Sequence, residues 1–201
     1  MKATAISRNR RVPERGVSSV EFAIILTVFL TLVMGAIDFG RVLWQWNRAA
    51  RATEVGVRLA AVRDPVALNV RGADGPILVP AGEAPPSDAL SPNPTICAEG
   101  GCGASLTALD PLLQDRAAFQ DLVAAMQAYN PRIAAANLIV EYRHVGVGLA
   151  GNTEGPDIDT IVTVSLRDLE LQFHALRFLQ IPPLRLPDFR ASLSAEDARG
   201  T

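Results

Sequence analysis

Apolar positions are concentrated near the start of the chain. Residues 22–37 carry no charge, and in the longer stretch from Val17 to Ile37 the only charged residue is Glu21. Twenty-one helical residues extend about 32 Å, and the hydrocarbon core of a bilayer is about 30 Å thick. The pattern therefore predicts one membrane-spanning helix.

A cleaved secretory signal peptide would also combine a basic start with an apolar middle. Its cleavage site needs small residues one and three positions before the cut. Ala36 has Met34 two positions before it, which fits poorly, so a retained anchor is favoured. Residues 1–16 contain five basic side chains, and Arg41, Arg48 and Arg51 follow the span. The larger basic cluster is expected on the cytoplasmic side, which places the N-terminus there.

The helical pattern continues beyond the apolar span. Apolar or small residues recur in alternating steps of four and three, the spacing of one helical seam, and Pro65 ends the pattern. We expect a helix from about Val17 to Arg63, with its second half outside the membrane and its seam packed on the chain's own C-terminal domain. Trp44 and Trp46 suit the headgroup boundary. The seam comprises Phe39, Leu43, Trp46, Ala50, Thr53, Val57 and Ala60.

Residues 64–110 hold seven of the 14 prolines, which predicts an extended loop region. This region contains the two cysteines, Cys97 and Cys102. With no nearby histidine and no second cysteine pair, metal ligation is less well supported than a local disulfide outside the cytoplasm. We expect no metal and no cofactor.

Residues 111–201 are typical of a compact α+β domain. Asp110 and Pro111 suit a helix start, and Asn130 with Pro131 suits its end. Alternating patterns predict strands at 137–145 and 160–166, with later candidates at 170–173 and 189–195, and the short connections favour antiparallel pairing. The apolar face of the helix comprises Phe119, Leu122, Val123, Met126 and Tyr129, and the inward faces of the first two strands comprise Leu138, Val140, Tyr142, Val162, Val164 and Leu166.

Three patterns in this domain could indicate a site. The glycines at 146–151 match a dinucleotide-binding pattern, but no helix can start at 152–156, so a hairpin loop is the better interpretation. Oxygen ligands at Asn152, Glu154, Asp157 and Asp159 match no defined calcium loop, and a solvated turn explains them as well. His144 and His174 are interpreted as structural or surface residues.

Charge is divided unevenly along the chain. Residues 1–63 have ten basic and four acidic side chains, a net charge of +6, whereas residues 64–201 have nine and 17, a net charge of -8. An acidic folded domain argues against a nucleic-acid partner.

Glu21 is unusual for a plain membrane anchor. A carboxylate costs on the order of 2.5–3.5 kcal/mol near the bilayer centre, so such residues are generally functional, although Glu21 could instead reach the headgroups. Around it, Arg15-Gly16, then Val20-Glu21-Phe22-Ala23 and the run from Gly35 to Arg41 resemble the TadE-like branch of type IV pilins and pseudopilins from tight-adherence (Flp) pilus systems. The similarity continues through Ala49-Ala50-Arg51 and Gly56-Val57-Arg58.

The resemblance implies cleavage by a prepilin peptidase between Gly16 and Val17. It also implies an assembly or processing role for Glu21, with Phe22 in the same motif. Relatives often have a proline in the middle of the apolar segment, where this chain has Thr27, so a kink there is not expected from this sequence. The implied partners are the prepilin peptidase, other Tad pilins, inner-membrane assembly components and the lipid bilayer.

The predicted fold class is therefore α+β: a pilin-like transmembrane helix followed by an extracytoplasmic domain with a small antiparallel sheet. Its parts are a basic leader (1–16), the long helix (17–63), a loop region (64–110) and the outer domain (111–201). By resemblance the chain is a non-enzymatic minor pilin or pseudopilin of the bacterial inner membrane. The alternatives are a membrane-anchored extracytoplasmic enzyme and an uncleaved envelope adaptor.

Overall fold

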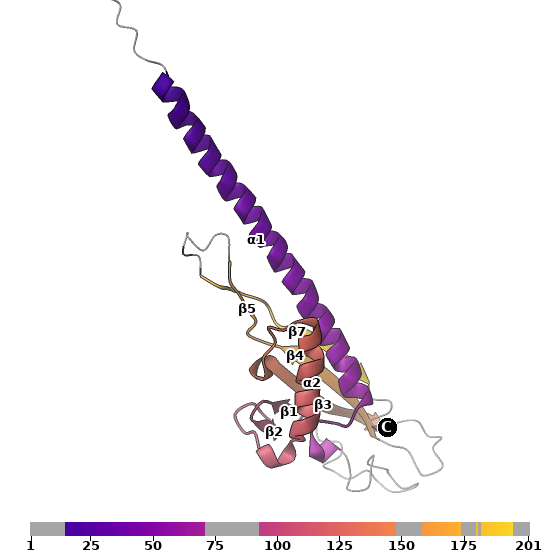
Figure 1. Cartoon of the computed structure of the whole chain (residues 1–201). Coiled ribbons are helices and arrows are strands. Elements are labelled where there is room, and N and C mark those ends of the chain that lie inside the picture. Colours follow the sequence, from indigo (N-terminus) through magenta and orange to yellow (C-terminus); the bar gives the residue numbers. More distant parts are fainter. Residues whose placement is uncertain (1–14, 71–92, 148–157, 174–179, 181, 195–201) are drawn as a thin grey trace, which may run out of the picture. The chain divides into compact units, whose positions relative to one another are not determined.

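The computed structural model describes residues 15–70, 93–147, 158–173, 180 and 182–194 (Figure 1). The chain forms two compact units, one of residues 1–41 with 173–182 and the other of residues 42–172 with 183–201. The described residues comprise a long N-terminal helix and a domain with a small antiparallel sheet, which confirms the predicted α+β class.

The first element is helix α1, Arg15–Val62, which has 48 residues. The predicted helix over 17–63 is confirmed to within two residues at each end. No proline or glycine pair interrupts the stretch, and α1 continues through Thr27 without a break. Pro65 follows shortly after its last turn, as expected for a residue that cannot continue a helix.

In the second unit, α1 buries one continuous stripe of small side chains. The positions follow the steps of three and four that place residues on one helical face. They are Ala49, Ala52, Thr53, Gly56, Val57, Ala60 and Ala61. The predicted seam was correct for Thr53, Val57 and Ala60 but wrong for Phe39 and Leu43, which are exposed. Both residues precede Ala49, at which the buried stripe begins, so they lie before the part of α1 that packs on the domain.

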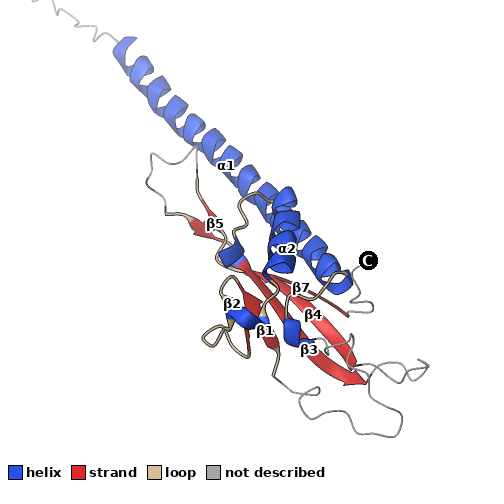
Figure 2. Cartoon of the chain, turned by 60° about the horizontal axis from the view of Figure 1, so that its bottom comes forward, coloured by secondary structure: helices blue, strands red, loops and turns tan. Residues whose placement is uncertain are grey.

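Helix α2, Arg116–Tyr129, lies beside the second half of α1 in both views (Figures 1 and 2). The two helices come close at Gly56, where an added Cβ would lie 2.7 Å from the Met126 sulfur. Phe119, Leu122, Val123 and Met126 are buried as predicted, whereas Tyr129, at the end of the helix, is exposed.

The start of α2 differs from the expectation. Asp110 caps a separate 3-10 turn, Pro111–Leu113, and α2 begins later, where the Asp115 carboxylate accepts hydrogen bonds from Ala117 N and Ala118 N. Both aspartates are suitable caps, so the sequence offers two helix starts within five residues. Asn130 ends α2 as predicted.

The main sheet has five strands in the order β2-β1-β3-β4-β7, and every pairing is antiparallel. Strands β3 and β4 turn their apolar positions toward the core, where the six predicted inward residues are buried. The bounds are Thr95–Ala98 for β1, Gly101–Gly103 for β2, Leu138–Val147 for β3, Ile158–Leu166 for β4 and Phe189–Ser194 for β7; β5, Glu170–Leu171, pairs with β6, Leu184–Arg185. Two short 3-10 helices, Leu68–Val70 and Ala135–Asn137, complete the order.

Strands β1 and β2 come from the proline-rich region that the sequence predicted as loop. They form a tight hairpin whose first strand, β1, pairs with β3, so this part of the region belongs to the sheet. Gly101, with a φ of 139°, and Gly103 pass so close to the segment at 108–111 that a Cβ on either would overlap its backbone. Neither strand exceeds four residues, which is too short for alternation to be recognised.

The segment after α1 is fixed to the sheet by hydrogen bonds. Val66 N donates to the Tyr142 hydroxyl at 2.9 Å, and Asp115 N donates to Val66 O at 2.8 Å. Gln114, which is buried, donates from its side chain to Ala98 O at 2.8 Å. Buried polar groups are costly unless paired, so these bonds hold the end of α1, the start of α2 and the β1–β2 hairpin in a defined arrangement.

Candidate functional site

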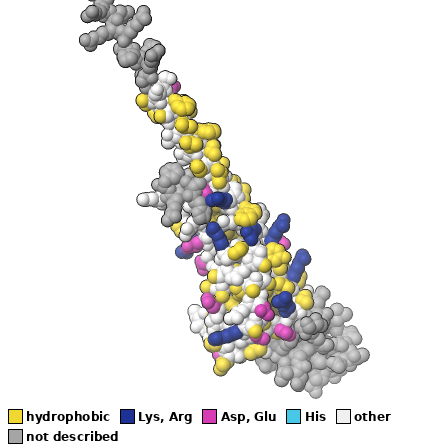
Figure 3. Space-filling model, in the orientation of Figure 1, with side chains coloured by type: hydrophobic (Ala, Val, Ile, Leu, Met, Phe, Trp, Pro, Cys, Tyr) yellow, Lys and Arg dark blue, Asp and Glu magenta, His cyan; other side chains and the backbone are white. Residues whose placement is uncertain are grey.

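The first part of α1 is apolar around its whole circumference. Among the described residues, this is the one helix long and apolar enough to cross a membrane, and none of its most apolar stretch is buried within the protein. Val20, Phe22, Val28 and Leu32 are each more than 60% exposed, and Figure 3 shows hydrophobic side chains along the visible face. A helix that is apolar on every side requires an apolar surrounding such as lipid or other helices.

The hydroxyl groups within this apolar part are satisfied by the helix itself. Thr27 Oγ1 donates to Ala23 O and Thr31 Oγ1 donates to Thr27 O, both at 2.8 Å. In a bilayer each polar group must find a partner inside the protein. The two threonines are therefore compatible with a membrane span.

The predicted cleavage position lies in the first turn of α1. The backbone of Gly16 and Val17 is helical, and Glu21 is an exposed residue of the same helix. Residues four apart lie on the same face, so Glu21 follows Val17 by about one turn. The first turn has backbone N–H groups without helical partners and opens at little cost, which suits a bond that a peptidase must reach.

A second acidic residue occurs at the end of the apolar part of α1. Asp38 is only 2% exposed, and its side chain interacts with other groups of the protein. A buried carboxylate is costly unless paired. The sequence offered Asp38 only as part of a motif, with no signal for its burial.

The two cysteines face each other across the β1–β2 hairpin. Cys97 and Cys102 are directly paired in the register, fully buried, and joined by a disulfide with a Cα–Cα distance of 4.0 Å. The bond closes a loop of only a few residues, which in the chain-entropy model stabilises by about 2 kcal/mol. Its role is local: it links the two strands of the hairpin covalently at the edge of the sheet.

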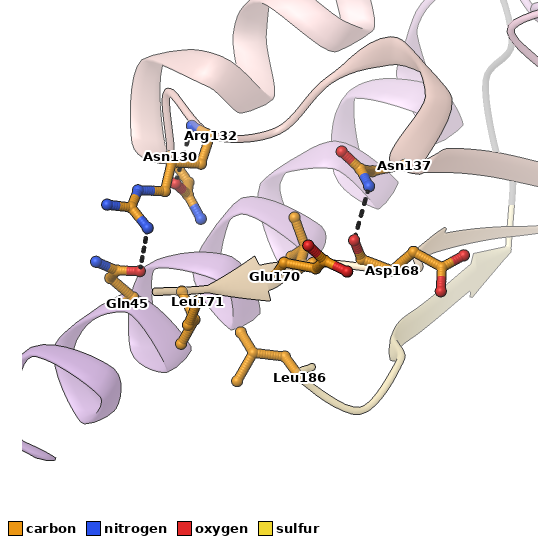
Figure 4. A pocket seen from close by; sticks show the side chains of 9 residues that line it. Gln45, Asn130, Arg132, Asn137, Asp168, Glu170, Leu171 and Leu186 are labelled. Atoms are coloured by element: carbon orange, nitrogen blue, oxygen red, sulfur yellow. Dashed lines mark hydrogen bonds between the residues drawn. The ribbon is translucent and has the colours of Figure 1, made fainter. Parts of the chain in front are cut away.

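A polar cavity of about 260 Å³ lies beside the second half of α1 (Figure 4). Arg132 Nη1 donates to Gln45 Oε1 at 3.2 Å, and Asn137 Nδ2 donates to Arg167 O and Asp168 O. Glu170 at its edge forms an ion pair with Arg185 at 3.3 Å. These contacts join α1 to the segment after α2, that segment to the residues before β5, and β5 to β6. The polar groups around the cavity therefore hold these elements together.

His144 is the histidine that the structure describes. Its Nδ1 lies 2.9 Å from Thr160 Oγ1, and burial lowers its pKa from the ordinary value of 6.5. This environment favours a neutral ring held by a hydroxyl group. No further titratable group accompanies it in these contacts, which agrees with a structural residue.

Several sequence candidates fall outside the described residues. These are His174, the glycines at 148 and 151, and Asn152, Glu154 and Asp157. The backbone of Asp159 lies in β4, but its side chain is outside the described part of the structure. Among the residues that were described, no group of three or more His, Cys, Asp or Glu could hold a metal ion.

Together these features define the class of protein: a helix suited to membrane anchoring, followed by an α+β domain with a stapled hairpin. Residues 16–58 match the family model of the TadE-like proteins, which confirms the resemblance drawn from the sequence. The match covers the apolar part of α1, Glu21 and most of the buried stripe, and supports a pilin-like role associated with tight-adherence pili. No curated protein and no solved structure matches the chain.

Proposed function

We propose that this chain is a minor pilin or pseudopilin that takes part in assembling a tight-adherence pilus. The observation that carries the proposal is the coincidence, within the TadE-like match, of an exposed apolar helix with one carboxylate near its start. A plain anchor has no need of that carboxylate, whereas a subunit that leaves the bilayer to pack against similar helices can use it.

The proposed sequence of events begins at the leader. A prepilin peptidase cleaves between Gly16 and Val17 on the cytoplasmic side, and the new amino group of Val17 then lies about one turn from Glu21. An ammonium and a carboxylate within one turn offset each other's cost in an apolar surrounding. The apolar helix holds the subunit in the inner membrane, with the domain outside the cytoplasm, until it packs against other pilin helices.

The first prediction concerns Glu21. Glu21→Ala and Glu21→Gln should both lower leader processing or pilus assembly; assembly should suffer because the Val17 ammonium that cleavage creates would lose its counter-charge. A loss of 1.4 kcal/mol is a factor of ten, and an uncompensated charge in the bilayer costs more, so we expect a decrease on the order of tenfold or greater. Processing is measured by the mass of the membrane-extracted chain, and assembly by the amount of sheared filament.

The matched control is Glu54→Gln, which removes an exposed carboxylate from the same helix beyond the apolar part. This variant should be processed and assembled like the wild type. If both Glu21 variants match the wild type in both measurements, the proposed role of Glu21 is wrong.

The proposal also covers the setting of the domain. A disulfide between Cys97 and Cys102 persists in the oxidising environment outside the cytoplasm, which suits the proposed topology. A membrane-anchored enzyme remains the second candidate, but the polar cavity does not favour it, because Arg132 donates to Gln45 and Glu170 pairs with Arg185, contacts that join neighbouring elements.

A further inference from the structure

The solvent face of α1 in the second unit carries a basic stripe. We give the name basic stripe to Trp44, Arg48, Arg51, Val55 and Arg58, which follow one another in steps of four and three and therefore share one helical face. Its length is roughly 21 Å at 1.5 Å per residue. The single acidic residue of this half of α1, Glu54, lies to one side of the stripe.

The stripe lies opposite the side of α1 that packs on the domain. The buried positions run from Ala49 through Gly56 to Ala61, about half a helical turn away from Arg51 and Arg58. Arg51 and Arg58 are thus not needed to form the core, whereas Arg48 is half-buried and its Nε donates to Tyr129 O at the end of α2. Trp44 is 58% exposed and lies under the Arg48 guanidinium, at 4.6 Å from its ring centre, so the stripe also presents an apolar surface.

The arginines of the stripe differ from those of the sheet region in their partners. Arg143 and Arg190 each lie 2.9 Å from Glu141, and Arg167 and Arg185 each have a carboxylate within 4 Å. In the part of the chain that the structure describes, Arg51 and Arg58 are exposed without an ion pair. Three arginines beside one carboxylate, Glu54, leave an excess of positive charge on this side of the helix, and such a surface favours an acidic partner.

An acidic groove of about 510 Å³ lies on the same domain, between the end of α1 and the start of α2. It is lined by Asp64, Asp115 and Asp121 against one basic residue, Arg63, and its apolar wall includes Leu59 and Ala118. Asp121 can accept a guanidinium group, whereas Asp115 caps α2 and Asp64 already interacts within the protein. The apolar wall can receive the methylene chains of arginine.

We propose that the basic stripe of one copy of this chain binds the acidic groove of a second copy. The inference rests on the proposed function, since it identifies one contact by which such subunits associate. The stripe and the groove are different surfaces of one molecule, so the contact is heterologous and leaves a free stripe and a free groove at the ends. A repeated heterologous contact that does not close into a ring produces a helical filament.

The decisive experiment is a charge exchange between two full-length chains with different affinity tags, reconstituted together in phosphatidylcholine vesicles. Arg51→Glu with Arg58→Glu should reduce co-purification of the two tags at least fivefold, and so should Asp121→Arg, because each creates repulsion across the contact. Mixing the stripe variant with the groove variant should restore co-purification, because the intact stripe of the groove variant then faces the intact groove of the stripe variant, and the reversed stripe faces the reversed groove.

A matched control reverses two arginines elsewhere on the domain. Arg167→Glu with Arg185→Glu makes the same change in net charge, at half-exposed ion pairs of little energetic value, and should leave co-purification unchanged. Equal thermal unfolding of all variants establishes that they fold. Wild-type association should also weaken as the salt concentration rises from about 0.05 to about 0.5 M, because salt screens the attraction between exposed charges.

The result that overturns the inference is a charge exchange that does not restore co-purification, or wild-type tags that never co-purify. Association that depends on the stripe but requires a different protein would also overturn it. The test is independent of leader processing, which is read by mass on the same samples. Processed chains that do not associate contradict only this inference, whereas chains that associate but keep their leader in peptidase-containing cells contradict only the proposed function.

Discussion

At the scale of residues, the fold depends on buried polar groups that each have a defined partner. Tyr142, Gln114 and Thr163 project from the sheet region or its neighbouring turn, and their side chains bond to Val66 N, Ala98 O and Ser192 Oγ. The sequence placed Tyr142 in the core but could not reveal its bond across 76 positions. Partners so distant along the chain are set by tertiary packing, which no local pattern encodes.

His144 provides a prediction about pH. Its folded pKa lies below the ordinary value of 6.5, so the folded protein holds the neutral ring more strongly than the unfolded chain does. The stabilisation is fully present above pH 6.5 and is lost as pH falls through the folded pKa, because the unfolded chain binds the proton first. His144→Gln should therefore make the free energy of unfolding less dependent on pH between 7 and 5.

Denaturant unfolding of the two full-length chains in detergent at several pH values measures this difference. All other titratable groups are common to both proteins, so they cancel in the comparison. An unchanged slope, or a wild type that gains stability on acidification relative to the variant, would show that burial does not control this ring.

At the scale of elements, long and strongly periodic segments were predictable and short ones were not. The sequence anticipated α1, α2, β3, β4 and β7, because each has either a long helical pattern or an alternating one. It missed β1, β2 and β6, which are two to four residues long. Their pairing depends on partners elsewhere in the chain: the existing edge of β3 for β1, β1 for β2, and β5 for β6.

The β1–β2 hairpin supplies a prediction that distinguishes two adjacent glycines. Gly101 has a φ of 139°, and an added Cβ would lie 2.5 Å from the Asp110 backbone, so Gly101→Ala strains the hairpin and displaces the turn that precedes α2. We expect it to reduce the free energy of unfolding by at least about 2 kcal/mol. Thermal or denaturant unfolding of the oxidised full chain provides the measurement.

Gly100→Ala is the control for this substitution. Its Cβ would meet the Leu109 side chain at 3.6 Å, an ordinary contact, and both substitutions restrict the unfolded chain in the same way. The control should change stability by less than about 0.5 kcal/mol. Equal effects of the two substitutions would contradict the close approach of the hairpin to Asp110.

At the scale of the whole molecule, the small net charge of -2 conceals parts of opposite sign. Residues 1–16 carry five basic side chains and one acidic, and residues 64–201 carry a net charge of -8. Removal of the leader would leave 185 residues whose side chains have a net charge of -6. In this remaining chain, the second half of α1 presents its arginines on one face. The family match covers most of the helix, whereas the acidic domain lies entirely beyond the matched residues.

The central claim is that the chain is processed as a pilin-like subunit, and the mass of the protein extracted from bacterial membranes tests it most directly. We predict a chain that begins at Val17, with Cys97 and Cys102 oxidised and therefore two hydrogens lighter than the reduced form. The same chain from cells without prepilin peptidase should keep its leader. A mature protein that begins at Met1 in peptidase-containing cells would contradict the account and favour an uncleaved envelope anchor.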